Sequence, residues 1–110
     1  MSTFKFPIMN PLLHNELRLK VMVALDSLKS ANFMYLCDIT GSTRGNLSVQ
    51  IKKLQESGYI KVDKSGSGAT ARSVCCITSK GHECLLAYEQ GLRRLFSEQV
   101  PSSDEHEKVV

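Results

Sequence analysis

The stretch "GSTRGNLSVQIKKLQESGYIKV", residues 41–62, decides the fold because it predicts a turn, a helix and the start of a strand in direct succession. Leu47, Ile51 and Leu54 recur at the spacing of one helical face. Gly58 stands where a helix commonly ends on a left-handed residue. The residues after Gly58 alternate in hydropathy, which favours a strand.

The first turn of this helix has an unusual composition. Ser42 or Thr43 can cap the helix, but the residues that follow are Arg44, Gly45 and Asn46. An acid would suit the positive end of the helix dipole better than an arginine, and a glycine inside a helix costs about 1 kcal/mol relative to alanine. These residues make the first turn less stable than it could be, which indicates that they serve a contact outside the helix.

Two further helices are expected upstream. Over residues 11–28 apolar side chains recur at intervals of three and four, which predicts a helix with a buried face formed by Leu13, Leu17, Val21, Met22, Leu25 and Leu28. A short helix follows, with Asn32 as its N-cap, Gly41 as its stop and an apolar face made of Phe33, Leu36, Cys37 and Ile39. Two helices joined by a few residues that include glycine are typical of a helix-turn-helix unit.

A hairpin and a last helix are expected downstream. Ile60 and Val62 lie on one face of the first strand, and residues 74–77 form the second strand beyond a glycine-rich tip. Thr78 or Ser79 can then cap a helix. The apolar positions of that helix are Leu85, Tyr88, Leu92, Leu95 and Phe96.

The predicted order is three helices, a β-hairpin over residues 61–77 and a C-terminal helix, which is a mostly helical α+β fold. We expect one domain over residues 1–110. Its parts are an N-terminal arm at 1–10, a folded core at 11–96 and an acidic, disordered tail at 97–110.

Positive charge is concentrated in the middle of the chain. The net charge is only +3, but residues 43–72 contain six bases and two acids, a net charge of +4. The segments before and after carry +1 and −2. A basic middle segment is the pattern that an anionic partner would require.

Other classes of protein are disfavoured. No window holds the roughly 18 uncharged apolar residues of a membrane span, and the first residues lack the features of a secretory signal, so we expect a cytoplasmic protein with no membrane contact. The four cysteines show no framework spacing, which favours reduced thiols. The three histidines lie far apart, and no catalytic or metal-ligand spacing is present. The sequence therefore predicts no enzymatic activity, no metal and no cofactor.

The exposed side of the helix that starts at Thr43 is the candidate binding surface. Opposite the apolar face lie Gly45, Asn46, Val49, Lys52, Lys53 and Glu56, with Arg44 and Ser48 on a flank. This layout suits a DNA major groove, where arginine can donate twice to guanine, asparagine can pair with adenine, and valine can touch a thymine methyl. A glycine allows close approach, and an acid in the first turn would repel the duplex. The alternative is an ordinary solvated face whose lysines keep the protein soluble.

Three runs carry a family resemblance: "LHNELRLKVMVAL", "FMYLCDITGSTRGNLSVQIKKLQESGYIKV" and "ITSKGHECLLAYEQGL". Over residues 12–96 they resemble the winged-helix transcriptional regulators related to the MarR and ArsR groups. The most specific part, T-x-G-N-L-S-x-x-I-x-K-L-x-x-x-G-Y-I, is similar to a recognition helix leading into the first wing strand. The resemblance implies a winged helix-turn-helix fold and a sequence-specific regulator of double-stranded DNA, acting as a repressor.

The resemblance also implies which residues touch DNA. The recognition helix would supply Thr43, Arg44, Gly45, Asn46, Ser48, Val49, Lys52 and Lys53, and the hairpin, as the wing, would supply Lys64 and Arg72. The wing tip "SGSGATA" is less charged than many such wings, which argues against strong minor-groove readout.

The resemblance further implies a homodimer, formed through the first and last helices, whose apolar content is generous for a small domain. Phe4, Phe6, Ile8 and Met9 could form an arm over the partner, or all of these side chains could fill the core of one subunit. Two other functions stay open: a winged-helix protein-protein interaction module without DNA binding, and a thiol- or metal-responsive regulator. The sequence does not define a small-molecule effector.

Overall fold

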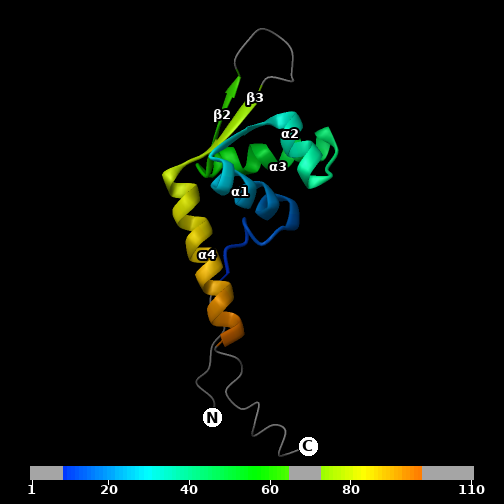
Figure 1. Cartoon of the computed structure of the whole chain (residues 1–110). Coiled ribbons are helices and arrows are strands. Elements are labelled where there is room, and N and C mark those ends of the chain that lie inside the picture. The colour runs from blue at the N-terminus through cyan, green and yellow to red at the C-terminus, as the bar shows by residue number, and fades with distance from the viewer. Residues whose placement is uncertain (1–8, 65–72, 98–110) are drawn as a thin grey trace, which may run out of the picture.

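Four helices and a small antiparallel sheet make up the described part of the chain, residues 9–64 and 73–97 of a computed structural model (Figure 1). The elements are, in order, α1 (Glu16–Leu28), β1 (Ser30–Asn32), α2 (Phe33–Thr40), α3 (Arg44–Glu56), β2 (Ile60–Lys64), β3 (Ser73–Ile77) and α4 (Ser79–Ser97). The predicted α+β order of three helices, a hairpin and a last helix is confirmed. Most of the expected arm (1–8), the hairpin tip (65–72) and nearly all of the expected tail (98–110) lie outside the described residues.

The sheet contains one strand that the sequence analysis missed. Its order is β1-β3-β2, and both neighbouring pairs are antiparallel. β1 pairs Ala31 with Cys75 of β3, and Val62 of β2 flanks Cys75 on the other side. A strand of three residues is too short to show alternation in the sequence, and it forms because the free edge of β3 has backbone groups to pair. Cys75 thereby lies in the middle of the sheet with no exposed surface.

The first helix is shorter than predicted. The expected start at Pro11 is wrong, since α1 begins at Glu16. Asn15 caps α1 by accepting the backbone N–H of Arg18 at 2.9 Å. Just upstream, the Asn10 side chain accepts the backbone N–H groups of the second and third residues after it, at 2.9 and 3.2 Å. The Asn10 side chain thus satisfies the backbone N–H groups of a separate turn that precedes the helix. Apolar periodicity alone does not distinguish such a turn from the first turn of a helix.

The ends of α2 and α3 follow the prediction. Asn32 caps α2, and its side chain accepts the N–H of the third residue after it at 2.7 Å. Thr43 rather than Ser42 caps α3 in the same way, at 3.1 Å. Gly41 and Gly58 end the two helices with φ of 71° and 78°, a backbone region that glycine enters without a steric penalty. The helix-turn-helix unit is therefore fixed by local chemistry.

The core is made by one face of each element. Its buried members are Leu13, Val21, Met22, Leu25, Leu36, Cys37, Leu47, Ile51, Leu54, Tyr59, Ile60, Cys75, Leu85 and Tyr88. Three residues that the predicted apolar faces included are instead exposed, namely Leu28, Ile39 and Phe96. Leu28 and Phe96 lie at or near the ends of their helices, and the short α2 already uses its inward side for Leu36 and Cys37.

The long α4 leaves the sheet and runs past α1 (Figure 1). Thr78 caps it by accepting the N–H of Gly81 at 2.9 Å. The His82 ring is hydrogen-bonded to Asp26 of α1 at 2.6 Å, and Tyr88 is bonded to His14 at the same distance. These contacts hold α4 against α1 and against the turn that precedes α1. Within residues 9–64 and 73–97, none of the helices is both long enough and apolar enough to cross a membrane.

Candidate nucleic-acid interface

The candidate DNA-binding residues that the structure describes are all exposed. They are Thr43, Arg44, Gly45, Asn46, Ser48, Val49, Lys52, Lys53 and Lys64. Leu47, Ile51 and Leu54 are buried on the opposite side of α3, which attaches the helix to the body. Arg72 lies outside the described residues. The predicted inward and outward faces of α3 are therefore both correct.

The first turn of α3 presents a positive end to the surroundings. It contains no acid, and the cap residue Thr43 satisfies only the N–H of Asn46. The other early N–H groups of a helix have no partner within the helix and favour an anion such as phosphate. No hydrogen bond or ion pair joins the Arg44 guanidinium to another residue of the ranges 9–64 and 73–97. Arg44 is thus available for an external acceptor.

Gly45 is not required by the packing of its own chain. A Cβ built on Gly45 meets no atom within 4 Å, and its φ is not in the left-handed region. A side chain would fit there and would favour the helix by up to about 1 kcal/mol. Glycine at this position is therefore consistent with a binding partner that comes close to the backbone of α3.

Asn46 belongs to a hydrogen-bonded chain that the sequence analysis missed. Gln50, one turn further along α3, donates from Nε2 to Asn46 Oδ1 at 3.3 Å. Gln50 in turn accepts a hydrogen bond from Arg18 of α1, and Arg18 also donates from Nε to the backbone oxygen of Leu12 at 2.6 Å. The spacing of Asn46 and Gln50 could have indicated their contact. Nothing in the sequence indicated Arg18.

The hairpin supplies a second cationic position. Lys64 ends β2, opposite Ser73 of β3, and its side chain is exposed, as is that of Lys61 on the same strand. Figure 1 shows β2 and β3 extending from the body at the end opposite to α4. The hairpin and α3 are in contact through β2. The structure therefore brings Lys64 to a strand that packs beside the candidate helix.

The two buried thiols, Cys37 and Cys75, give little support to a metal- or oxidant-responsive function. Burial, together with a smaller effect of the adjacent Cys76, raises the pKa of the Cys75 thiol to about 11. Burial also raises the pKa of the Cys37 thiol, although the Arg44 guanidinium lowers it in part. Both groups are thus held as unreactive thiols at neutral pH. In the part of the chain that the structure describes, no three His, Cys, Asp or Glu side chains are grouped to hold a metal ion.

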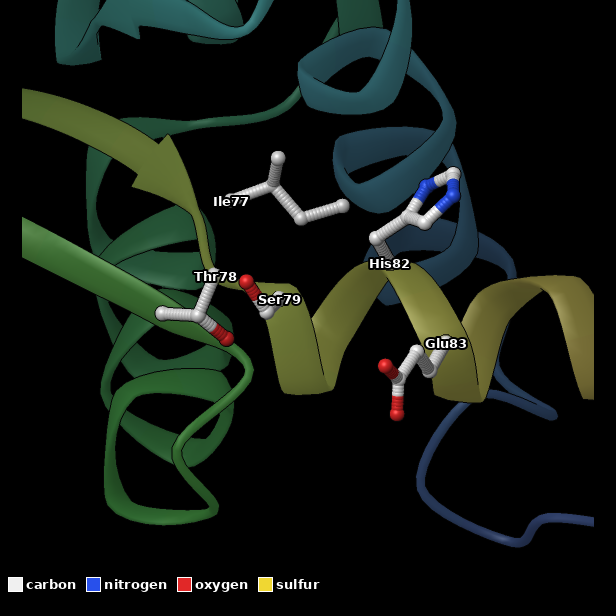
Figure 2. Close-up of a pocket in the computed structure, with 5 residues that line it drawn as sticks. All are labelled: Ile77, Thr78, Ser79, His82 and Glu83. Carbon is white, nitrogen blue, oxygen red and sulfur yellow. The ribbon is translucent and has the colours of Figure 1, made fainter.

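One shallow pocket lies where β3 meets α4. Its volume is about 280 Å³, and it is lined by Ile77, Thr78, Ser79, His82 and Glu83 (Figure 2). In Figure 2 the His82 ring and the Glu83 carboxylate point to different sides. The pocket is open, and it is slightly smaller than the roughly 300–1,000 Å³ of ordinary ligand sites. It supports no particular effector.

Comparison with known proteins identifies a winged-helix family and solved structures of the same fold. The family model described as a winged helix DNA-binding domain matches residues 17–96. An uncharacterized protein of Methanocaldococcus jannaschii is 32% identical over 71 residues, which make up 64% of this chain and 77% of that protein. A solved transcriptional regulator homologue from Pyrococcus horikoshii superposes with a TM-score of 0.74 at 27% identity, over 81% of this chain and 88% of that chain.

Structures at lower identity share the fold. The transcriptional repressor CouR, solved on a 23-mer DNA duplex, has a TM-score of 0.67 at 18% identity, over 90% of this chain and 71% of that chain. A MarR-family transcriptional regulator from Silicibacter pomeroyi is also among these structures. The expected likeness to MarR-type winged-helix regulators is therefore confirmed.

Proposed function

Because the chain belongs to the winged helix DNA-binding domain family, we propose that it is a transcriptional regulator that binds double-stranded DNA sequence-specifically, with α3 in the major groove. The observation that carries this proposal is the first turn of α3. It is exposed, free of acids and contains a glycine that the packing of the chain does not need. A helix start of this kind can come close to a phosphate and to base edges at once.

The proposed contacts follow from the chemistry of each exposed side chain. Base edges are read by Arg44 at guanine, by Asn46 at a purine and by Val49 at a thymine methyl. The phosphate backbone is bound by the other members of the set, Thr43, Ser48, Lys52, Lys53 and Lys64, with Gly45 allowing the approach. Arg72, which directly precedes β3 in the sequence, is proposed as a further backbone contact.

A homodimer is part of the proposal. Exposed apolar side chains on the two helices expected at the dimer interface support it: Val23 on α1, and Leu86 and Phe96 on α4. Phe96 is 69% exposed in one subunit, so its ring is accessible to a partner subunit. Twofold symmetry would put two α3 helices about 34 Å apart, one helical repeat of DNA, and would match a palindromic site.

In this proposal the protein works by binding alone. A dimer on its operator represses transcription by occupying DNA, which needs no catalytic group, metal or cofactor. We place it in the cytoplasm, where the duplex is accessible in a cell without a nucleus and where thiols stay reduced. Residues 1–110 are proposed to contain one winged-helix domain, with an arm at 1–10 and a tail at 97–110 flanking the folded core at 11–96.

The salt dependence of binding tests the proposal against an interaction module that does not touch DNA. Binding to labelled random duplex is expected at low salt, and log affinity should fall linearly with log salt concentration by about 0.9 for each phosphate neutralised. The measurement is a fluorescence anisotropy titration at several salt concentrations. Absence of binding at low salt would exclude the DNA-binding proposal and favour the interaction module.

Gly45→Ala is expected to act on stability and on binding in opposite directions. The free energy of unfolding should rise, by up to about 1 kcal/mol, because alanine favours the helix and meets no neighbour. Affinity for duplex should fall, because the added methyl group keeps the helix start away from the DNA. Thermal melting and the anisotropy titration give the two values.

Gly91→Ala provides the matched control. Gly91 is also inside a helix, and its added Cβ would meet only Met9 Sδ, at 4.0 Å. This variant should gain stability in the same way while its affinity for duplex stays unchanged. Equal affinities of Gly45→Ala and the wild type would show that nothing approaches Gly45.

A further inference from the structure

A chain of hydrogen bonds connects the body of the protein to Asn46 on the exposed face of α3. Arg18 of α1 is partly buried, and its Nε donates to the backbone oxygen of Leu12 at 2.6 Å. A terminal nitrogen of the same guanidinium donates to Gln50 Oε1. Gln50 Nε2 then donates to Asn46 Oδ1 at 3.3 Å. Each link in the chain therefore has one donor and one acceptor.

The direction of this chain is dictated by Arg18. A guanidinium has only donors, so the Gln50 atom that faces it must be the amide oxygen. The Gln50 amide nitrogen consequently faces Asn46, and the Asn46 atom that meets it must be Oδ1. Asn46 is left with both hydrogens of Nδ2 and with one further lone pair on Oδ1. The amide of Asn46 is thereby held in one of its two possible orientations.

We infer that Arg18 and Gln50 are positioning residues that fix the orientation of the Asn46 amide toward DNA and so help to determine which base it recognises. This inference rests on the proposed function and deepens it. An Asn46 amide held in this orientation offers a donor to N7 of a purine. At adenine the free lone pair of Oδ1 can also accept from the N6 amino group, so adenine is the base that fits best. Neither Arg18 nor Gln50 needs to touch the DNA.

Gln50→Glu reverses the direction of the hydrogen bond between the side chains of residues 50 and 46, and it provides the sharpest test. A carboxylate bonds to Arg18 but can only accept from Asn46, so the Asn46 amide must turn and donate Nδ2 to it. Oδ1 then faces the DNA, and a base that donates, such as cytosine through N4, becomes favoured. Gln50→Met removes the hydrogen bonds of this side chain to Arg18 and Asn46 without adding charge. The Asn46 amide should then be free to take both orientations.

The readout is the base preference at each position of a duplex site selected from a random library. Asn46→Ala first identifies the position that Asn46 reads in each half-site. At that position Gln50→Glu should change the preferred base, and Gln50→Met should reduce the preference of the wild type, on the order of tenfold. All other positions, and the salt dependence of Gln50→Met, should match the wild type.

Variants of Arg18 separate positioning from a general loss of structure. Arg18→Lys keeps a group that only donates and should preserve the preference, whereas Arg18→Met should reduce it at the same position. Thermal melting of each variant identifies any unfolded protein. Preferences that are unchanged in Gln50→Glu and Gln50→Met would overturn the inference while leaving the proposed function intact. A wild type that selects no sequence would overturn the proposed function itself, and the inference with it.

Discussion

Replacement of Arg44 by alanine is expected to lower affinity for the preferred duplex by about one to two orders of magnitude per half-site, while affinity for random duplex falls only a fewfold. A bidentate contact between arginine and guanine discriminates against the wrong base by about 1–3 kcal/mol, whereas a random duplex loses one phosphate-neutralising charge. Arg44 is exposed and has no hydrogen-bond or ion-pair partner among residues 9–64 and 73–97, so the fold should not change. Anisotropy titrations with both duplexes measure the two effects.

Two control variants identify the cause of the loss. Arg44→Lys keeps the charge but lacks the planar fork, so it should keep affinity for random duplex and lose much of the sequence preference. Lys64→Ala, on the hairpin strand, should weaken binding to both duplexes alike and make the salt dependence less steep by about one phosphate per subunit. If Arg44→Ala preserves the sequence preference, the reading face of α3 has been placed on the wrong residues.

The sequence predicts the helix-turn-helix unit well because local chemistry alone determines it. Asn32 and Thr43 have side chains that cap a helix wherever they stand, and Gly41 and Gly58 take the left-handed backbone that ends each helix. Helical spacing then distinguishes the buried from the exposed face of α3 without further information. The same reasoning gives the exposure of the candidate contact residues.

Other parts of the fold depend on partners that are distant in the sequence. β1 exists because β3 has an edge to pair with, and its three residues have no pattern of their own. The end of α1 is a second case. Lys29 takes a φ of 73° without being glycine, while its N–H remains bonded to the oxygen of Leu25 at 2.7 Å. A lysine does not predict such a backbone, so the tertiary structure must impose it.

The candidate site likewise combines features that the local sequence determines with features that depend on distant residues. The surface residues of α3 follow from helical geometry, but the contact of Arg18 with Gln50 joins residues separated by 32 positions. A partly buried arginine and a surface glutamine have many possible partners in a sequence. Only the packing of α1 against α3 selects this pair. The exposed face of α3 can therefore be predicted from the sequence, whereas the residues that we propose to orient Asn46 cannot.

Gly81→Ala is expected to lower the free energy of unfolding by about 2 kcal/mol or more, and to lower the melting temperature by roughly 10 °C or more. Gly81 is buried in the first turns of α4, where a Cβ would lie 2.1 Å from the backbone oxygen of Tyr59 and 3.1 Å from Ile77 Cγ1. The same oxygen accepts the N–H of Thr78 at 3.0 Å, so it cannot move without losing a hydrogen bond that holds the cap residue of α4 in place. The clash should outweigh the gain of about 1 kcal/mol from helix propensity.

Gly91→Ala is again the matched control, because it makes the same substitution in the same helix without a close neighbour. Gly81→Ala and Gly91→Ala should therefore move the melting temperature in opposite directions, although helix propensity predicts a gain for both. A higher melting temperature for Gly81→Ala would mean that the start of α4 does not approach Tyr59 so closely. Since α4 also carries the exposed Phe96 of the proposed dimer interface, displacing its first turn should weaken subunit association too. Sedimentation of the two variants at equal concentration would separate that effect from the loss of stability.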